Sequence, residues 1–119
     1  MELDWSSGEL ADGLRLYRAG EFFAAHESWE LVWLRTPPPE KGFLQGLIQV
    51  TAAFHHGKRG NPQGTRLLLQ AALMRLDSLP DDFGGVCVAP LRDDIRSRLA
   101  HLETDSTSVS PVEIRLIAG

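Results

Sequence analysis

The sequence has few of the features that secreted, membrane-spanning and nucleic-acid-binding proteins require. Cys87 is its one cysteine, so no disulfide can form within the chain, and a reducing compartment is expected. No apolar run approaches the length of a membrane span, and the N-terminal residues lack the basic and apolar regions of a signal peptide. We therefore expect a cytoplasmic protein with no membrane partner.

Positive charge is also in short supply. The chain has 12 Lys and Arg, scattered along its length, against 16 Asp and Glu, and its formal net charge is -4. Proteins that bind nucleic acid usually carry a basic patch that neutralises backbone phosphates. The sequence therefore predicts no nucleic-acid partner.

What the chain does have is the composition of a globular protein. Hydrophobic residues make up 43% of its 119 residues and charged residues 24%, which is ordinary for a folded domain. This length can bury a core without metal or disulfide support. We expect a single helical domain over residues 1–119.

Helical periodicity and helix-breaking residues predict about five helices. The predicted helices run from Ser6 or Ser7 to Gly20, from Glu21 to about Arg35, from Pro38 or Pro39 to Gly60, from Asn61 to Pro80, and from near Pro90 through Leu102. The segments 81–88 and 104–110 are expected to be connections, and the alternating residues after Pro111 predict an extended tail against the bundle. The predicted fold class is all-α: an irregular bundle of about five helices with an extended C-terminal tail.

The stretch Glu21–Trp33 carries the most unusual pattern in the chain. On a helix that turns about 100° per residue, its large aromatic residues share one side with His26 and Glu30, and Glu27 lies at the margin. Burying a histidine or a carboxylate costs free energy unless each finds a partner. We therefore expect a neighbouring helix to supply polar groups.

The predicted third helix has matching polar residues. Gln45, Gln49 and His56 fall in one sector, with the small Ala52 between them, whereas His55 lies outside it and is interpreted as a packing residue. Only about four residues connect the second and third helices, so these helices should be antiparallel neighbours, with the glutamates of one across from the glutamines of the other. The sequence thus predicts a polar seam. Its candidate pocket residues are His26, Glu27, Glu30, Gln45, Gln49 and His56.

Several roles are consistent with such a seam. His26, Glu30 and His56 make a two-histidine, one-carboxylate set that suits a divalent Zn, Mn or Fe ion. Glu27 or Glu30, desolvated by the tryptophans, could instead exchange protons with a histidine as the general acid or base of an enzyme whose substrate the sequence does not specify. A hydrogen-bonded network that fixes helix packing without any ligand is the structural alternative. The sequence leaves open whether the chain is an enzyme.

The predicted fourth helix is apolar on two faces. One face carries Leu67, Ala71 and Met74, and the other Leu69, Leu73 and Leu76. Such a helix is either central in the bundle or half of a subunit interface. A non-enzymatic helical scaffold that forms a homodimer is therefore the alternative to a small-molecule or metal-binding pocket.

Three segments of the chain closely resemble the hallmark segments of a family of small bacterial and archaeal proteins, domain-of-unknown-function family 309. The segments are GEFFAAHESWELVW, LQGLIQVTAAFHHGKRGN and GTRLLLQAA, and the resemblance covers roughly Leu14 to Leu76. It implies an all-helical, irregular bundle and no established activity. The polar positions typical of the family fall here on Glu21, His26, Glu27, Glu30, Gln45, Gln49, His56, Gly60 and Asn61.

Overall fold

The computed structural model describes residues 2–104 and 108–117. In the described chain α1 spans Gly8–Arg18, α2 Phe22–Leu34, α3 Glu40–Lys58, α4 Pro62–Asp77 and α5 Val88–Glu103, and β1 Asp82–Phe83 pairs with β2 Val86–Cys87. The predicted all-α irregular bundle is confirmed. Part of the predicted 104–110 connection, residues 105–107, and the end of the tail, residues 118–119, lie outside the described residues. No helix in the described ranges combines the length and apolar character needed to cross a membrane.

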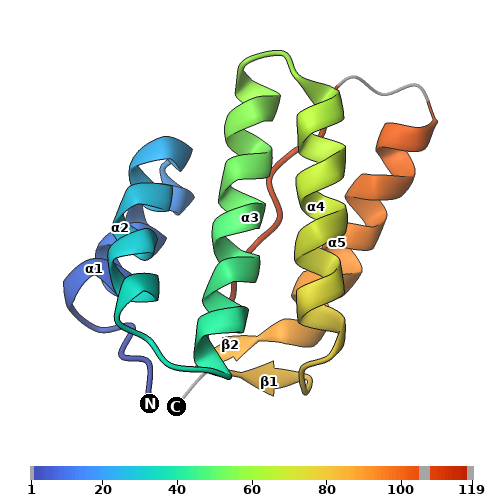
Figure 1. Ribbon diagram of the computed structural model, residues 1–119. Helices are drawn as coiled ribbons and strands as arrows, with labels where there is room; N and C mark the ends of the chain where they lie inside the picture. The colour runs from blue at the N-terminus through green and yellow to red at the C-terminus, as the bar shows by residue number, and fades with distance from the viewer. Residues whose placement is uncertain (1, 105–107, 118–119) are drawn as a thin grey trace.

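The helix α3 is the centre of the arrangement. Figure 1 shows α2 and α4 on either side of α3, with α1 against α2 and α5 against α4. Buried residues recur along α3 from Phe43 to Phe54. The helix breaks fall where the sequence predicts them: the three prolines 37–39 separate α2 from α3, and Asn61 caps α4 by accepting a hydrogen bond from the Gly64 N–H at 3.0 Å.

Trp29 organises the contact between α1 and α2. Its fully buried ring packs edge-to-face on Trp5 and stacks on Tyr17, with 6.1 Å between centroids in each pair. The indole Nε1 donates a hydrogen bond to the Leu10 carbonyl at 3.1 Å. Gly13 lies directly beneath the indole, where any side chain would overlap the ring. The two helices approach closely because α1 has no side chain at this point.

The C-terminal tail lies extended against the bundle, as its alternating pattern predicts. Val112 and Ile114 are buried, and the Tyr17 hydroxyl donates to the Val112 carbonyl at 2.6 Å. Leu116 of the tail also pairs with Val86 of β2 in an isolated antiparallel β-bridge. In Figure 1 the tail passes behind α3 and α4.

The two-stranded hairpin β1–β2 is absent from the sequence-based prediction, which treats residues 81–88 as a connection. Gly84 and Gly85 form its turn with φ of 60° and 85°. A Gly-Gly pair between two short apolar runs is a hairpin signal, because both central residues of such a turn need positive φ. The signal is present in the sequence, but strands this short are easily missed.

Candidate functional site

The α2 half of the predicted seam has its buried and exposed residues arranged differently from the prediction. Phe22, Ala25 and Trp29 are buried, but Glu27 and Glu30 are exposed, the Glu30 side chain by 50%. Phe22 and Trp29 therefore point into the core, whereas Phe23, at 57% exposure, and the two glutamates lie toward solvent. The expectation that the tryptophans desolvate these glutamates is wrong, because both carboxylates lie beyond the edge of the buried face.

One predicted contact on α2 does form. His26 Nδ1 lies 3.5 Å from Glu30 Oε2, as expected for two residues one helical turn apart. The His26 side chain is 31% exposed, so the pair sits at the protein surface. A charge pair in this setting is largely screened by water and contributes little to folding.

The polar stripe of α3 lies on the outer surface, between α2 and α4, and not within the α2–α3 contact. Gln45, Gln49, Ala52 and His56 are all half-buried. Within the described chain no hydrogen bond joins either glutamine to α2, and Gln49 Oε1 is buried without a hydrogen-bond partner. The predicted network linking the glutamines, the glutamates and the histidines is therefore not assembled.

The two neighbouring histidines of α3 exchange the roles that periodicity assigns to them. His55 faces α2: its ring lies 5.5 Å from the ring of Phe23, which also stacks on His26 at 6.5 Å. His56 faces α4, where its Nδ1 is 3.3 Å from Nδ2 of Asn61. His55 therefore joins the seam and His56 supports the turn before α4, which corrects the interpretation of His55 as a packing residue turned away from the site.

The three predicted metal ligands, His26, Glu30 and His56, do not converge. Within residues 2–104 and 108–117 no three His, Cys, Asp or Glu side chains form a group that could hold a metal ion. The reason is the orientation of α3, which turns His56 toward α4 while His26 and Glu30 remain on α2. The structure brings together two of the three predicted ligands.

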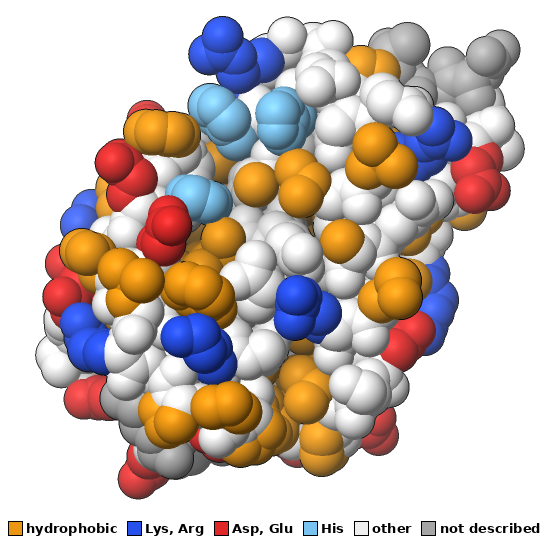
Figure 2. Space-filling view, in the orientation of Figure 1, with side chains coloured by type: hydrophobic (Ala, Val, Ile, Leu, Met, Phe, Trp, Pro, Cys, Tyr) orange, Lys and Arg blue, Asp and Glu red, His pale blue; other side chains and the backbone are white. Residues whose placement is uncertain are grey.

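The seam holds a small surface pocket in place of a deep site. Phe23 and His26 of α2 and Ala52 and His55 of α3 line a hollow of about 120 Å³. Figure 2 shows histidine side chains gathered on one part of the surface, with apolar side chains beside them. Because an apolar cavity of roughly 150 Å³ is needed to take up a benzene ring, this pocket accepts only a few atoms of a ligand.

The surroundings of His55 change the pKa of its imidazole ring. Partial desolvation lowers the pKa of His55 below its ordinary value of 6.5, and the positive charges of Arg59, of His56 and His26 when protonated, and of Lys58 lower this pKa further. A neutral imidazole is therefore favoured next to Phe23 at neutral pH.

The two faces of α4 have different surroundings. Leu69 and Leu76 are buried in the core, but Leu67 is 54% exposed and Met74 79% exposed. The sequence leaves open whether α4 is central in the bundle or half of a subunit interface. In the structure the central position belongs to α3, not to α4. Figure 2 shows exposed apolar side chains on the same side of the molecule as the histidines.

Sequence reasoning missed a second hollow, where the start of α2 and the end of α3 meet the tail. It has a volume of about 260 Å³ and is lined in part by Phe22, Phe54, Lys58 and Val109. Lys58 Nζ reaches the Gly20 carbonyl at 2.7 Å. The spacing of Phe22 and Phe54 in the sequence predicts that they are buried in the core. It does not indicate that the tail leaves a space above them.

Comparison with known proteins places the chain in a family. The model of a family described as "Domain of unknown function (DUF309)" matches residues 10–68. An uncharacterized protein from Aquifex aeolicus is 35% identical over 84 residues, which are 70% of this chain and 25% of that protein. This chain thus spans about a quarter of the length of that relative.

A solved structure supports the same assignment. The crystal structure of a conserved hypothetical protein from Thermus thermophilus matches with a TM-score of 0.66 and 36% sequence identity, over 84% of this chain and 99% of that one. The fold and the sequence resemblance therefore agree, and the chain belongs to the DUF309 family of domains of unknown function.

Proposed function

We propose that this chain is a protein-assembly module that pairs with a second copy of itself through one face, formed by the outward sides of α2, α3 and α4. We call this the assembly face. The observation that carries the proposal is the exposure of large apolar side chains there: Met74 is 79% exposed, Phe23 57% and Leu67 54%. Contiguous apolar patches on a folded protein usually mark a binding surface.

The exposed residues of α4 follow helical periodicity. Leu67, Ala71 and Met74 recur at i, i+4 and i+7 and lie opposite the stripe that packs into the core. Fully burying a Leu or Met side chain contributes about 1.5–3 kcal/mol. A second helix laid on this stripe would therefore stabilise an assembly.

The outward residues of α3 are uncharged where they separate α2 from α4. Gln45, Gln49 and Ala52 are neutral and half-buried. Interface centres are depleted in charged residues and enriched in Met and aromatic residues, whereas the rim stays polar. The composition of the assembly face has this character.

The charges on the face favour a second copy as the occupant. Glu27 and Glu30 are exposed on α2, and Arg75 of α4, whose Cβ lies 3.7 Å from the position of a Cβ at Gly46 of α3, places a positive charge between α3 and α4. A two-fold axis parallel to α3 sets α2 of one copy on α4 of the other. The carboxylates of each copy then face the half of the other copy that carries Arg75.

The size of the face is sufficient. At about 1.5 Å per residue α3 is roughly 28 Å long, and three helices of about 10 Å diameter that pack at 8–10 Å span a width of roughly 30 Å, which gives a footprint of about 800 Å². Stable interfaces bury roughly 800 Å² per partner. That is about an eighth of the 6292 Å² of accessible surface.

Sedimentation velocity over a range of concentrations tests the proposal. The wild-type chain should form a dimer with a dissociation constant of micromolar order or tighter, and Met74→Glu should weaken it at least tenfold because it buries a charge. Ala100→Glu, which makes the same charge change at an exposed position of α5, is the control and should leave the dimer unchanged. A wild-type chain that stays monomeric at hundreds of micromolar would contradict the assembly role.

The contact between His26 and Glu30 favours a second candidate function, a surface site for one divalent Zn, Mn or Fe ion. The two donors are 3.5 Å apart and project from one side of α2, and water would complete the coordination. Thermal unfolding of untagged protein with and without each metal salt tests this site. We expect a rise in melting temperature that His26→Gln abolishes; an equal rise in both proteins would exclude the pair as ligands.

A further inference from the structure

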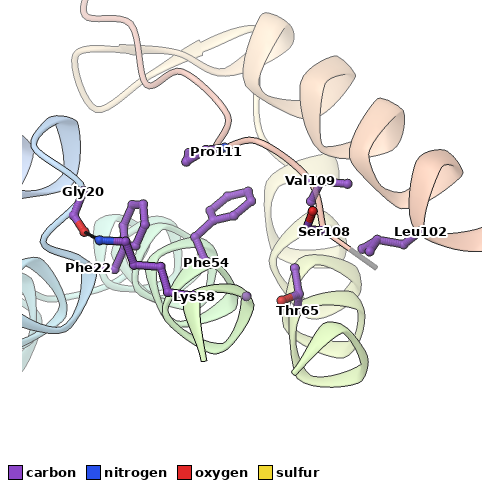
Figure 3. Close-up of a pocket in the computed structure, with 10 residues that line it drawn as sticks. Gly20, Phe22, Phe54, Lys58, Thr65, Leu102, Ser108, Val109 and Pro111 are labelled. Carbon is purple, nitrogen blue, oxygen red and sulfur yellow. Dashed lines mark hydrogen bonds between the residues drawn. The ribbon is translucent and has the colours of Figure 1, made fainter. Parts of the chain in front are cut away.

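The hollow under the tail is built from segments far apart in the sequence. The Gly20 turn, the last turn of α3, the start of α4 and residues 108–111 of the tail surround about 260 Å³ (Figure 3). Because the tail runs behind α3 and α4 in Figure 1, this hollow lies away from the assembly face. It is an independent candidate for ligand binding, beyond the proposed assembly role.

Its walls are aromatic and aliphatic. The rings of Phe22 and Phe54 are almost fully buried, with centroids 6.0 Å apart and planes tilted by 43°. Val109 and Leu102 are part of the same lining. Figure 3 shows the rings of Phe22 and Phe54 opposite Pro111 of the tail. An apolar ligand group would lie against these rings.

Lys58 places a positive charge at the edge of the apolar walls. Its Nζ donates a hydrogen bond to the Gly20 carbonyl at 2.7 Å and lies 5.4 Å from the centroid of the Phe22 ring. An ammonium group has three N–H donors, so two remain for a ligand. No Asp or Glu is among the described residues that line this pocket, so an anion placed beside Lys58 meets no opposing carboxylate in the lining.

A neighbouring hollow provides access. It has a volume of about 480 Å³, and Gly20, Phe22 and Pro111 line both spaces. Lys58 contacts Gly20, which lines both spaces, so its ammonium group lies beside the larger one, whose lining includes Glu113 together with Arg18 and Arg115. A ligand with an apolar end in the smaller space therefore has its polar end at Lys58, near solvent.

The volume sets the size of the apolar end. A dry apolar cavity of roughly 150 Å³ binds benzene, and the pocket of about 260 Å³ exceeds it. A single aromatic ring with a short acidic arm fits this space.

From the apolar walls, the ammonium group of Lys58 and the volume, we infer that the pocket under the tail binds a small aromatic monocarboxylate, with the ring against Phe22 and Phe54 and the carboxylate on Lys58. The charge-assisted hydrogen bond to the ammonium group distinguishes the acid from neutral molecules of the same shape. A ligand of this size binds with millimolar affinity.

A nuclear magnetic resonance titration of the ¹⁵N-labelled full chain tests the inference, with phenylacetate as the probe and phenylacetamide as its neutral counterpart. Phenylacetate should cause saturable shifts in the amide signals of residues 54–58, 108–110 and 112. The amide should bind at least tenfold more weakly, because it lacks the charge that Lys58 recognises.

Variants of the pocket complete the test. Lys58→Met keeps the aliphatic stem and removes the charge, so phenylacetate should bind at least tenfold more weakly; Lys58→Arg should restore binding. Val109→Trp should fill the space and prevent binding of both probes while the spectrum remains that of a folded protein. No saturable shift up to about 20 mM, equal affinity for acid and amide, unchanged affinity in Lys58→Met, or shifts confined to the assembly face would each overturn the inference.

Discussion

The two sides of α2 belong to the same thirteen-residue helix and have opposite surroundings. The inner side places Trp29 against Trp5, Tyr17 and Gly13, with its indole N–H hydrogen-bonded to the chain. The outer side carries Glu30, which is half exposed and pairs with His26. Both sides belong to one distinctive segment of the family sequence.

The difference separates residues that stabilise the fold from residues that are available for binding. A buried ring with fixed partners contributes to the free energy of unfolding, and its replacement costs several kcal/mol. A surface pair contributes little, so its side chains can bind a ligand or a second protein without loss of the fold. Three substitutions and one pH dependence test this division.

Gly13→Val should have the largest effect because it acts on the inner side of α2. A Cβ at this position lies 2.8 Å from Cε2 of Trp29, so α1 and α2 must separate. We expect the free energy of unfolding, measured by urea denaturation, to fall by about 3 kcal/mol. Gly42→Ala is the control: nothing lies within 4 Å of its Cβ position in α3, so it should keep or raise stability by up to about 1 kcal/mol. Equal effects of the two changes would show that the α1–α2 contact is not closely packed.

Tyr17→Phe should have an intermediate effect, because it removes the hydrogen bond that ties the inner side to the tail. The hydroxyl donates to the buried Val112 carbonyl at 2.6 Å, and leaving that carbonyl unpaired costs about 1–2 kcal/mol. Hydrogen exchange should report faster opening of the tail from Val112 to Leu116. Unchanged exchange in the tail would mean that apolar packing alone holds it.

Glu30→Gln should have a small effect, because it acts on the outer side. The ion pair with His26 is exposed, and such pairs contribute about 0.2–1 kcal/mol at most. We expect a change in unfolding free energy at the lower end of this range, measured as for Gly13→Val. A loss of several kcal/mol would place Glu30 in a structural network and break the division between the two sides.

The pH dependence of His55 should be the smallest effect. Desolvation and the nearby positive charges lower its pKa below 6.5, so below that pH the unfolded chain binds the proton more readily than the folded chain. Its stabilising contribution is therefore present above the ordinary pKa and is lost as the pH falls through the lowered pKa. Melting temperatures between about pH 7.5 and 5 should decline slightly less in His55→Gln than in the wild-type protein. A steeper decline in the variant would reverse this sign.

Most of the fold could be predicted because its signals are local. The prolines 37–39 and the Asn61-Pro62 pair fix helix boundaries through φ and hydrogen bonding, without reference to the rest of the chain. The alternation of Val112 and Ile114 likewise identifies a strand-like tail with one buried side. The β1–β2 hairpin has a local signal in Gly84 and Gly85, and its short strands explain why it was missed.

The candidate site could be predicted only in part, because it depends on which helices are neighbours. Periodicity placed Gln45, Gln49 and His56 in one sector of α3, and all three are half-buried, but the prediction that this sector faces α2 across a polar seam is wrong. Periodicity could not show that α4 packs against α3 on the side opposite α2. His56 consequently contacts Asn61, while His55 takes the place beside His26 and Phe23.

The sequence by itself determined the family, the all-helical class, the helix boundaries and the contact of His26 with Glu30 one turn away. Each of these follows from interactions within a few residues or from a matching segment. Tertiary structure alone decided that the polar stripe lies open between α2 and α4, that the apolar stripe of α4 is uncovered, and that the tail leaves a pocket above Phe22 and Phe54. The physical reason is that helical periodicity gives the angle of a side chain around its own axis, and only packing places another helix, the tail or solvent at that angle.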